Sequence, residues 1–249
     1  MRSKWLARVM PLLTILALGV QSVAAQTASG ASNTEELIFG LNTKLLIVAI
    51  PITVLTEGIL IYTVWRFSKS DEAKSTKENR RLEITWTVAT AVVLLFVGFS
   101  AYTVLGQPAV TSPADAEPQN EDLDVQVEAK SASWNWQFHY DNYNVTTTNT
   151  LYMQQDRQVY LNITSDQWLH AIHVPALGLK QDAVPGEYNT IQTTPLEPGT
   201  YQGYCAEYCG QGHSGMLFEV VVVESEEEML SKMEAECDGD WDAADQQCT

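Results

Sequence analysis

The sequence predicts a two-helix transmembrane hairpin followed by an all-β antiparallel sandwich. Two almost uninterrupted apolar stretches, residues 45–64 and 84–105, each have the roughly 20 residues that a helix needs to cross a bilayer. From residue 122 onward, short segments alternate apolar and polar residues and are separated by Pro-Gly pairs, which is typical of a sandwich. A loop near the end of this region, residues 205–216, gathers sulfur and imidazole groups and indicates a metal site.

Residues 1–25 have the features of a signal peptide: a basic start, a short apolar run and a small-residue cleavage site ending at Ala25. An uncleaved anchor helix is the alternative, which the shortness of the apolar run disfavours. Residues 26–43 are small and polar, and we expect them to form a mobile outer segment ahead of the hairpin.

The transmembrane hairpin is expected over residues 44–106. By the positive-inside rule, the basic loop between its two spans lies in the cytoplasm; its cations are Arg66, Lys69, Lys74, Lys77, Arg80 and Arg81. Both ends of the mature chain then lie on the outer, periplasmic face of the cell (plasma) membrane. Glu57 interrupts the first span, where it either contacts another subunit in a proton-related role or makes a structural hydrogen bond within the bundle.

A Pro-rich linker over residues 107–121 leads into the sandwich, residues 122–224, and an acidic tail follows over 225–249. The tail is expected to begin with a short helix. Its two cysteines, Cys237 and Cys248, form either a disulfide or two free thiols. Strands are expected at residues 122–129, 134–140, 159–163, 191–194, 200–204 and 216–223.

The charge of the chain excludes one class of partner. The formal net charge is −17, and there is no basic stripe that could neutralise phosphates, so binding to nucleic acid is excluded. An acidic surface attracts basic partners, but it is equally an adaptation to a salty habitat, and charge alone does not separate these two interpretations.

The loop from Cys205 to Met216 has the spacing C-x3-C-x3-H-x2-M, with His213 as the imidazole. Thiolate, imidazole and thioether form a soft ligand set that favours copper over magnesium or calcium. Because a second thiolate, that of Cys209, allows two metal ions to be bridged, the loop indicates a two-copper centre. A structural disulfide, a zinc site and a single copper are the alternatives; the first two do not account for Met216.

A dinuclear site needs a further ligand from outside the loop, as in cupredoxin-like domains, where one histidine comes from an earlier strand. His170 and His173 are the candidates, and in an extended strand they point to opposite faces. Spacing favours His170 but leaves the choice open. The remaining histidine, His139, follows Phe138 in an aromatic strand and is expected to lie at the surface or in the core.

At these residues the chain resembles the subunit 2 family of the haem-copper cytochrome c oxidases, over roughly residues 40–224. Four motifs carry the resemblance in order: Leu82-Glu83-Ile-Thr-Trp86, then Trp134-Asn-Trp136-Gln-Phe138, then the run from His170 to Gly186, and finally Gly203-Tyr-Cys205-Ala-Glu207-Tyr-Cys209-Gly-Gln-Gly-His213-Ser-Gly-Met216.

The resemblance implies a role for each matching residue. The side-chain ligands of a dinuclear copper-A centre would be His170, Cys205, Cys209, His213 and Met216, with the backbone carbonyl of Glu207 added. The Glu207 carboxylate would bind a magnesium or manganese ion shared with subunit 1. Trp134 would be the exposed tryptophan through which the electron arrives, and Glu83 would lie at the start of a proton-uptake path.

The implied function is that of the copper-A subunit of a terminal oxidase. It would take electrons from cytochrome c or a similar small redox donor and pass them to haem in subunit 1. There oxygen would be reduced to water with proton translocation, and subunit 3 would complete the complex. Gln167 and Glu187 depart from the family pattern, which leaves the identity of the donor open; the haem type and the pumping stoichiometry are open as well.

Other function classes make different demands on the chain. A membrane-tethered copper chaperone would need neither two bridging thiolates nor Trp134, and a quinol oxidase subunit would lack the copper ligands. Nitrous oxide reductase is soluble, so the predicted hairpin disfavours it. A copper-A nitric oxide reductase is harder to distinguish from a terminal oxidase by the sequence alone.

Overall fold

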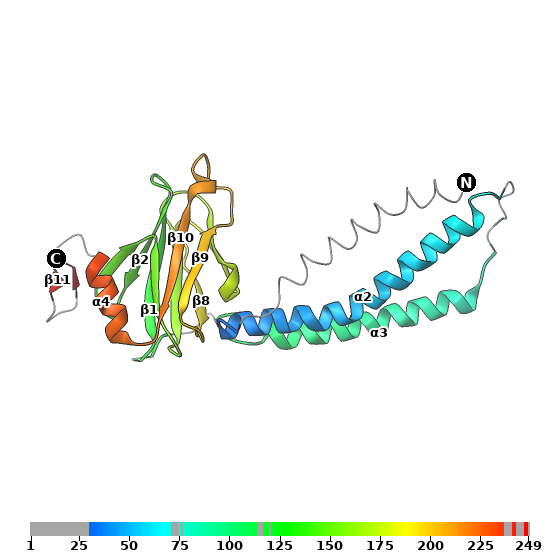
Figure 1. Cartoon of the computed structure of the whole chain (residues 1–249), viewed down its shortest axis with the longest axis horizontal. Helices are drawn as coiled ribbons and strands as arrows, with labels where there is room; N and C mark the ends of the chain where they lie inside the picture. The colour runs from blue at the N-terminus through cyan, green and yellow to red at the C-terminus, as the bar shows by residue number, and fades with distance from the viewer. Residues whose placement is uncertain are drawn as a thin grey trace, which may run out of the picture.

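The computed structural model describes residues 30–70, 75, 77–113, 117–119, 121–236, 241–242 and 247–248. A β-sandwich lies at one end of the molecule and a long helical hairpin extends from it (Figure 1). The predicted hairpin and sandwich are therefore both present. The predicted signal peptide, residues 1–25, lies outside the described residues.

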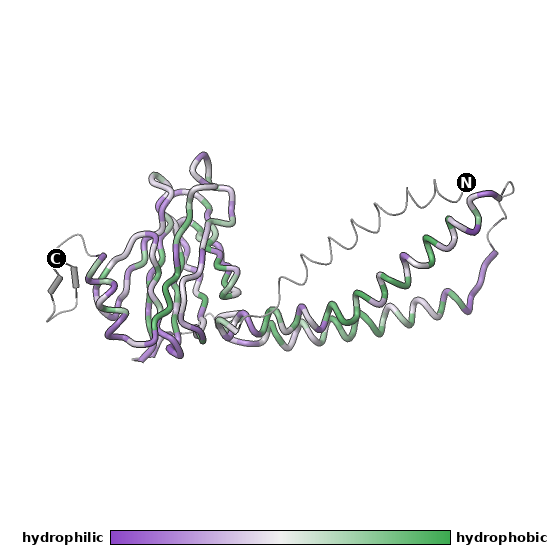
Figure 2. Tube along the Cα trace, in the orientation of Figure 1, coloured by the Kyte–Doolittle hydropathy of each residue, from purple (hydrophilic) through white to green (hydrophobic). Residues whose placement is uncertain are grey.

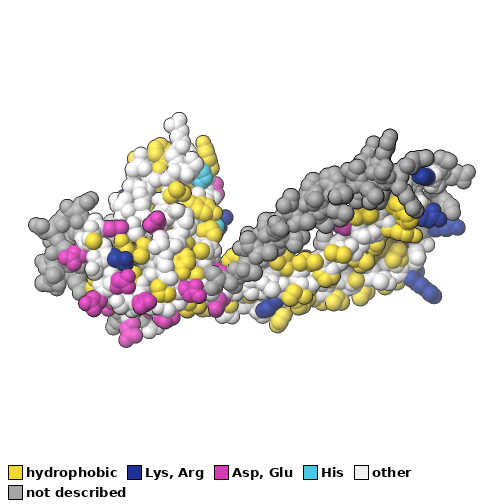
Figure 3. Space-filling model, in the orientation of Figure 1, with side chains coloured by type: hydrophobic (Ala, Val, Ile, Leu, Met, Phe, Trp, Pro, Cys, Tyr) yellow, Lys and Arg dark blue, Asp and Glu magenta, His cyan; other side chains and the backbone are white. Residues whose placement is uncertain are grey.

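The hairpin consists of α2 (Asn33–Phe67) and α3 (Arg80–Leu105), and both helices are long and apolar enough to cross a membrane. Their apolar side chains are exposed along almost the whole length. Figure 2 shows that hydrophobic residues run along both helices. In Figure 3 the Lys and Arg side chains gather mainly at the end of the hairpin away from the sandwich, while Asp and Glu gather on the sandwich. The basic residues and the acidic sandwich thus lie at opposite ends of the hairpin, and the cytoplasmic location of the basic end stays a prediction.

The first helix begins earlier than expected. Residues 33–43 belong to α2 and are not a mobile segment, and Thr34 and Glu35 are buried. Ser32 caps the helix: its side chain accepts a hydrogen bond from the backbone N–H of Glu35. Helix propensity does not predict this start of α2, because contacts with the sandwich stabilise its polar first turn. Farther along, α2 contains Pro51 and changes direction in Figure 1.

Two five-stranded sheets form the sandwich. The first has the order β3-β2-β1-β5-β8, with strands Val145–Thr148, Asn135–Tyr140, Leu123–Lys130, Val159–Ser165 and Asn189–Thr193. The second has the order β4-β10-β9-β6-β7, with strands Thr150–Gln154, Leu217–Val223, Gly199–Cys205, His170–Val174 and Leu179–Ala183. Two short 3-10 helices, η1 (Pro175–Leu177) and η2 (His213–Gly215), interrupt the loops.

The expectation of an entirely antiparallel sandwich is wrong at two pairings: β1 with β5, and β10 with β4, are parallel. Strands β3, β4 and β7 were not predicted. The first two are short and are separated only by Asn149, which adopts a positive φ of 60°. In β7 only the terminal residues, Leu179 and Ala183, are apolar and buried, so alternation is too weak to detect.

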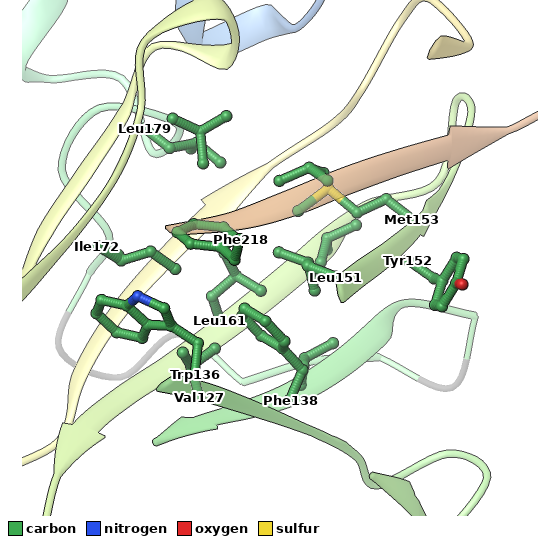
Figure 4. Packing of buried hydrophobic residues seen from close by; sticks show 14 of the residues in the cluster. Val127, Trp136, Phe138, Leu151, Tyr152, Met153, Leu161, Ile172, Leu179 and Phe218 are labelled. Carbon is green, nitrogen blue, oxygen red and sulfur yellow. The ribbon is translucent and has the colours of Figure 1, made fainter. Parts of the chain in front are cut away.

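The core lies between the two sheets, and large aromatic side chains fill it (Figure 4). Trp136 and Phe138 of β2 both pack against Phe218 of β10, with ring centroids 5.6 and 5.5 Å apart. Such ring pairs stabilise a core beyond the area that they bury. Phe218 lies directly over Gly203, where a Cβ atom would come within 2.1 Å of its ring. Because β9 and β10 flank the Cys205–Met216 loop, this packing fixes both ends of the loop.

The acidic tail starts with the expected short helix, α4 (Glu226–Glu236), which buries Met229 and Met233 against the sandwich. The Tyr143 hydroxyl donates a hydrogen bond to the Glu226 carboxylate, and Arg157 lies 3.4 Å from the same carboxylate. A small β-hairpin follows, β11 (Trp241–Asp242) and β12 (Gln247–Cys248). Cys237 and the side chain of Cys248 fall outside the described part of the chain, so their disulfide stays a prediction.

The N-terminal end of α2 is joined to the sandwich by a set of buried contacts. The Ser32 hydroxyl donates to the carbonyl of Leu177 at 2.7 Å, and Asn33 exchanges hydrogen bonds with Thr194. Gly178 lies against the backbone of Glu35, at a φ of +65° that favours glycine. Since Leu177 belongs to η1, directly after β6, these contacts link the hairpin to the strand that carries His170.

Candidate metal centre

The loop between β9 and β10 forms the candidate metal centre, and β6 places His170 beside it. Strand β6 pairs with β9, so that Ile172 lies opposite Cys205. The backbone N–H of Cys205 donates to the carbonyl of Met216 at 3.0 Å and closes the loop at its base. Residues distant in the sequence thus meet because β6 begins, and the adjacent antiparallel β9 finishes, at the same end of the second sheet.

Two sulfur atoms occupy the middle of the site. The Sγ atoms of Cys205 and Cys209 are 3.7 Å apart, far beyond the roughly 2.05 Å of a disulfide bond. The alternative of a structural disulfide therefore does not describe this structure. The ligand atoms of Cys205, Cys209 and His170 all lie within 4.8 Å of one another, which is compact enough for them to share a metal site.

The other predicted ligands surround this sulfur pair. On the Cys205 side, Nδ1 of His170 lies 3.7 Å from the sulfur, and the carbonyl oxygen of Glu207 lies 3.2 Å from it. The remaining two flank Cys209: Nδ1 of His213 is 3.6 Å from its sulfur and Sδ of Met216 is 3.9 Å from it. The other four predicted donor groups therefore converge on the two sulfurs, and the chemistry of all six fits soft or borderline metal ions such as copper.

Burial disfavours the ionised forms of the cysteine and histidine side chains at this site. Cys205 and Cys209 are each 3% exposed, and His170 and Met216 are fully buried. Burial, together with the neighbouring Cys205 thiol, raises the pKa of the Cys209 thiol to about 12. Burial also lowers the pKa of His170, so its imidazole is neutral at pH 7. A metal cation would compensate two thiolates here, and its binding would release their protons.

The structure brings His170, and not His173, to the sulfur atoms. Nδ1 of His173 lies 2.8 Å from the carbonyl oxygen of Leu179, and its ring packs edge-on against Tyr204. His139 is partly exposed and interacts with Thr146 and Asp141, so it belongs to the surface.

Trp134 lies against the metal loop but is half-buried, whereas the resemblance implied an exposed tryptophan. Its indole Nε1–H donates to the carbonyl of Cys209 at 3.1 Å. Its ring covers Gly212, where a Cβ atom would come within 2.3 Å of the ring, and Trp134 itself has a φ of 48°. The neighbouring Trp168, 6.1 Å away between ring centroids, is 46% exposed and presents the outer aromatic surface.

The structure does not bring the side chains of three other predicted residues to the sulfur pair. Glu83 lies in the first turn of α3, and Glu57 lies within α2; both are exposed. The side chain of Glu207 is exposed as well. Gln167 and Glu187, the two departures from the family pattern, are also exposed and leave the ligand cluster intact.

Sequence reasoning missed Ser131 and Asp166. The Ser131 hydroxyl lies 3.0 Å from Nε2 of His170, and the Asp166 carboxylate accepts a hydrogen bond from the Ser131 backbone N–H at 2.9 Å. Burial acts to raise the pKa of Asp166, but hydrogen bonds from the Ser131 side chain and backbone outweigh it and hold this pKa below its ordinary value. A serine in a turn gives no signal in the sequence; only the pairing of β1 with β5 reveals its position.

Comparisons with known proteins agree with the fold and the ligand cluster. The family described as "Cytochrome C oxidase subunit II, transmembrane domain" matches residues 9–104, and "Cytochrome C oxidase subunit II, periplasmic domain" matches residues 144–225. The family carries a copper-A centre, and His170, Cys205 and Cys209 of this chain form a cluster that could bind a metal.

Individual relatives of this chain are named cytochrome c oxidase subunit 2, in agreement with the two family matches. Cytochrome c oxidase subunit 2 of Alkalihalophilus pseudofirmus is 29% identical over 185 residues, covering 72% of this chain and 52% of that protein. That of Kluyveromyces lactis is 26% identical over 212 residues, covering 78% of this chain and 85% of the relative. The chain thus spans about half the length of the bacterial relative.

A solved structure, the periplasmic domain of subunit II of cytochrome oxidase (CoxB) of Bradyrhizobium japonicum, aligns with a TM-score of 0.43 and 26% identity over 48% of this chain and 96% of that one. The two family matches together account for most of the chain, and the curated relatives bear the family's name. The chain belongs to the cytochrome c oxidase subunit II family.

Proposed function

We propose that this chain is the copper-A subunit of a terminal oxidase. It accepts electrons singly from an external donor and passes them to haem in subunit 1, where oxygen is reduced to water with proton translocation. The observation that carries this proposal is the pair of buried sulfur atoms 3.7 Å apart, with imidazole, thioether and carbonyl donors on both sides.

The cofactor in this proposal is a pair of copper ions. The residues that would hold them are Cys205 and Cys209 through their sulfurs, His170 and His213 through Nδ1, Met216 through Sδ, and Glu207 through its carbonyl oxygen. Bound there, the copper pair would supply one-electron redox chemistry with the electron shared between both metals. The protein's contribution is a rigid, dry pocket that holds the ligands in place in both redox states.

Electron uptake is assigned to Trp134 and the surface next to it. The hydrogen bond from the Trp134 indole to the Cys209 carbonyl joins an aromatic ring directly to a residue that would hold the copper ions. The exposed Trp168 and Leu169 extend this surface outward. Cytochrome c, or a small redox protein of similar size, would dock here.

A second metal is assigned to the Glu207 side chain. The carbonyl oxygen of Glu207 faces the Cys205 sulfur, while its carboxylate is exposed and accessible to a magnesium or manganese ion at the contact with subunit 1. In the assembled complex loaded with manganese, Glu207→Gln is expected to abolish the manganese resonance signal and to leave the copper signal unchanged. Retention of the manganese signal in the variant would contradict this assignment.

The hairpin anchors the subunit in the plasma membrane, with the sandwich on the periplasmic side. Its exposed apolar surface is suited to lipid and to the helices of subunits 1 and 3, and Glu57 would face one of those helices. Glu83, in the first turn of α3 at the end remote from the sandwich, would lie near the cytoplasmic mouth of a proton path.

Oxygen consumption by the purified oxidase complex tests the proposal. The double variant Cys205→Ser/Cys209→Ser removes both bridging thiolates at little cost in volume, and it should abolish oxygen consumption driven by the reduced donor. Ser214→Ala, an exposed position in the same loop, is the matched control and should keep the activity. A copper-free complex with normal donor-driven oxygen consumption would refute the proposed function.

A further inference from the structure

We infer that Ser131 and Asp166 are positioning residues that hold the His170 imidazole in one tautomer, with Nδ1 free to bind metal. The role of these two residues in metal binding rests on the proposed copper site. Their contacts with His170 are present without any metal. Ser131 lies in the turn between β1 and β2, and Asp166 directly follows β5. The two elements are adjacent because Ala129 of β1 lies opposite Ser165 of β5.

The two nitrogen atoms of His170 face different surroundings. Nδ1 points to the Cys205 sulfur at 3.7 Å, whereas Nε2 lies 3.0 Å from the Ser131 hydroxyl oxygen. His170 and Ser131 are both fully buried, and the edge of the Trp136 ring packs against the imidazole with 6.2 Å between centroids. Bulk water therefore does not choose the tautomer; the Ser131 hydroxyl does.

The hydrogen-bonding capacity of Ser131 decides the direction of this contact. A serine hydroxyl has one O–H to donate and two lone pairs to accept. The backbone N–H of Trp168 donates to Ser131 Oγ at 3.1 Å and uses one lone pair. The Asp166 carboxylate can only accept hydrogen bonds, and it already accepts one from the Ser131 backbone N–H at 2.9 Å. We assign the Ser131 O–H to this carboxylate as well, in line with the effect of the Ser131 side chain on the Asp166 pKa, which is held below its ordinary value. With this assignment one lone pair is left for His170 at 3.0 Å, so Nε2 carries the proton and donates it.

The consequence is a fixed Nε2–H tautomer. The lone pair of Nδ1 then points towards the sulfur pair before any metal arrives, and the carboxylate of Asp166 polarises the imidazole through the serine. A histidine ligand whose remote N–H is held in this way is oriented and more basic, and loss of such a partner typically lowers metal affinity about 10–100-fold. Ser131 is the residue that connects Asp166 to His170, because Asp166 acts on the imidazole through the Ser131 hydroxyl.

Nitrogen-15 NMR of the copper-free full chain in detergent tests the tautomer directly. The chain has four histidines, so selective histidine labelling gives an interpretable spectrum. In the native chain, the two ring nitrogens of His170 should show protonated Nε2 and unprotonated Nδ1. In Ser131→Ala the spectrum should move towards a mixture of both tautomers. A native chain with protonated Nδ1, or a Ser131→Ala spectrum identical to the native one, would overturn the inference.

Copper titration of the same full-length variants tests the consequence. Ser131→Ala should bind copper about 10–100-fold more weakly. Ser133→Ala is the matched control, since its hydroxyl donates to the side chain of Asn135 at 2.9 Å, and its affinity should be unchanged. Asp166→Asn, at an exposed position, keeps an acceptor for the Ser131 O–H but removes the charge, and it should give a smaller loss.

The outcomes separate this inference from the proposed function. Equal copper affinities for Ser131→Ala and Ser133→Ala would overturn the positioning role even if the native chain binds two coppers. A native chain that binds a single copper would refute the dinuclear proposal, while the tautomer measurement would still decide the role of Ser131.

Discussion

Replacement of Gly178 by alanine should detach the first turn of α2 from the sandwich. An added Cβ atom would lie 2.9 Å from both Cα and N of Glu35, closer than real Cβ contacts. Neither atom can rotate away, because both belong to the backbone of a helix. The first turn of α2 must therefore shift, and with it the contacts of Ser32 and Asn33 with the sandwich.

The expected cost has two parts. Alanine at a φ of +65° costs about 1–2 kcal/mol relative to glycine. The steric part adds the loss of the hydrogen bond from Ser32 to the Leu177 carbonyl and of the Asn33–Thr194 contacts, at about 1 kcal/mol for each of these two sites. Gly178→Ala should therefore destabilise the docked state by about 3–4 kcal/mol.

Gly186→Ala is the matched control. Gly186 has a φ of +79°, but an added Cβ atom there would meet nothing within 4 Å, so alanine carries only the backbone cost. Hydrogen exchange of the full chain in detergent measures the difference at the amide of Glu35, which donates to the Ser32 hydroxyl. The excess of about 2 kcal/mol should speed that exchange about 30-fold in Gly178→Ala over Gly186→Ala. Equal exchange rates in the two variants would refute this account of the contact.

Three further predictions concern the metal centre. Gly212→Ala should displace the Trp134 ring, which lies 2.3 Å from the new Cβ position, so stopped-flow reduction by the donor should slow while the copper spectrum persists; loss of the copper spectrum would contradict this. Cys205→Ser should lower the bound copper, measured by elemental analysis, from two ions to one or none, and retention of two ions would show that the thiolate does not bridge. Burial holds the pKa of His170 below its ordinary value near 6.5, so the unfolded chain takes up a proton at this residue before the folded chain does as the pH falls. The free energy of unfolding of the copper-free chain should therefore decrease below about pH 6.5. Chemical denaturation at pH 7.5 and pH 5 measures this decrease, which His170→Gln should reduce; an unchanged decrease in that variant would assign it to other groups.

The sequence was most informative where chemistry or periodicity is local. The two apolar spans and the alternation in β1 and β2 predict their elements because each reflects one repeated environment. The loop from Cys205 to Met216 predicts its own chemistry, since four ligand groups stand within one short loop. Contacts between distant segments were not predictable in the same way.

Three particular features show why. The first turn of α2 is polar and has no periodic signal, so its helical start depends on Leu177 and Thr194, which lie far away in the sequence. The parallel pairing of β1 with β5 leaves no trace in either strand's pattern. Ser131 contacts His170 only because of that pairing, and a lone serine in a turn is too common to be singled out.

The electron paramagnetic resonance spectrum of the oxidised, copper-loaded chain tests the central claim most directly. If Cys205 and Cys209 bridge two coppers, one unpaired electron is shared between two equivalent nuclei, and the spectrum should show seven hyperfine lines. A four-line pattern would mean that the electron is confined to one copper, and it would contradict the proposed dinuclear centre.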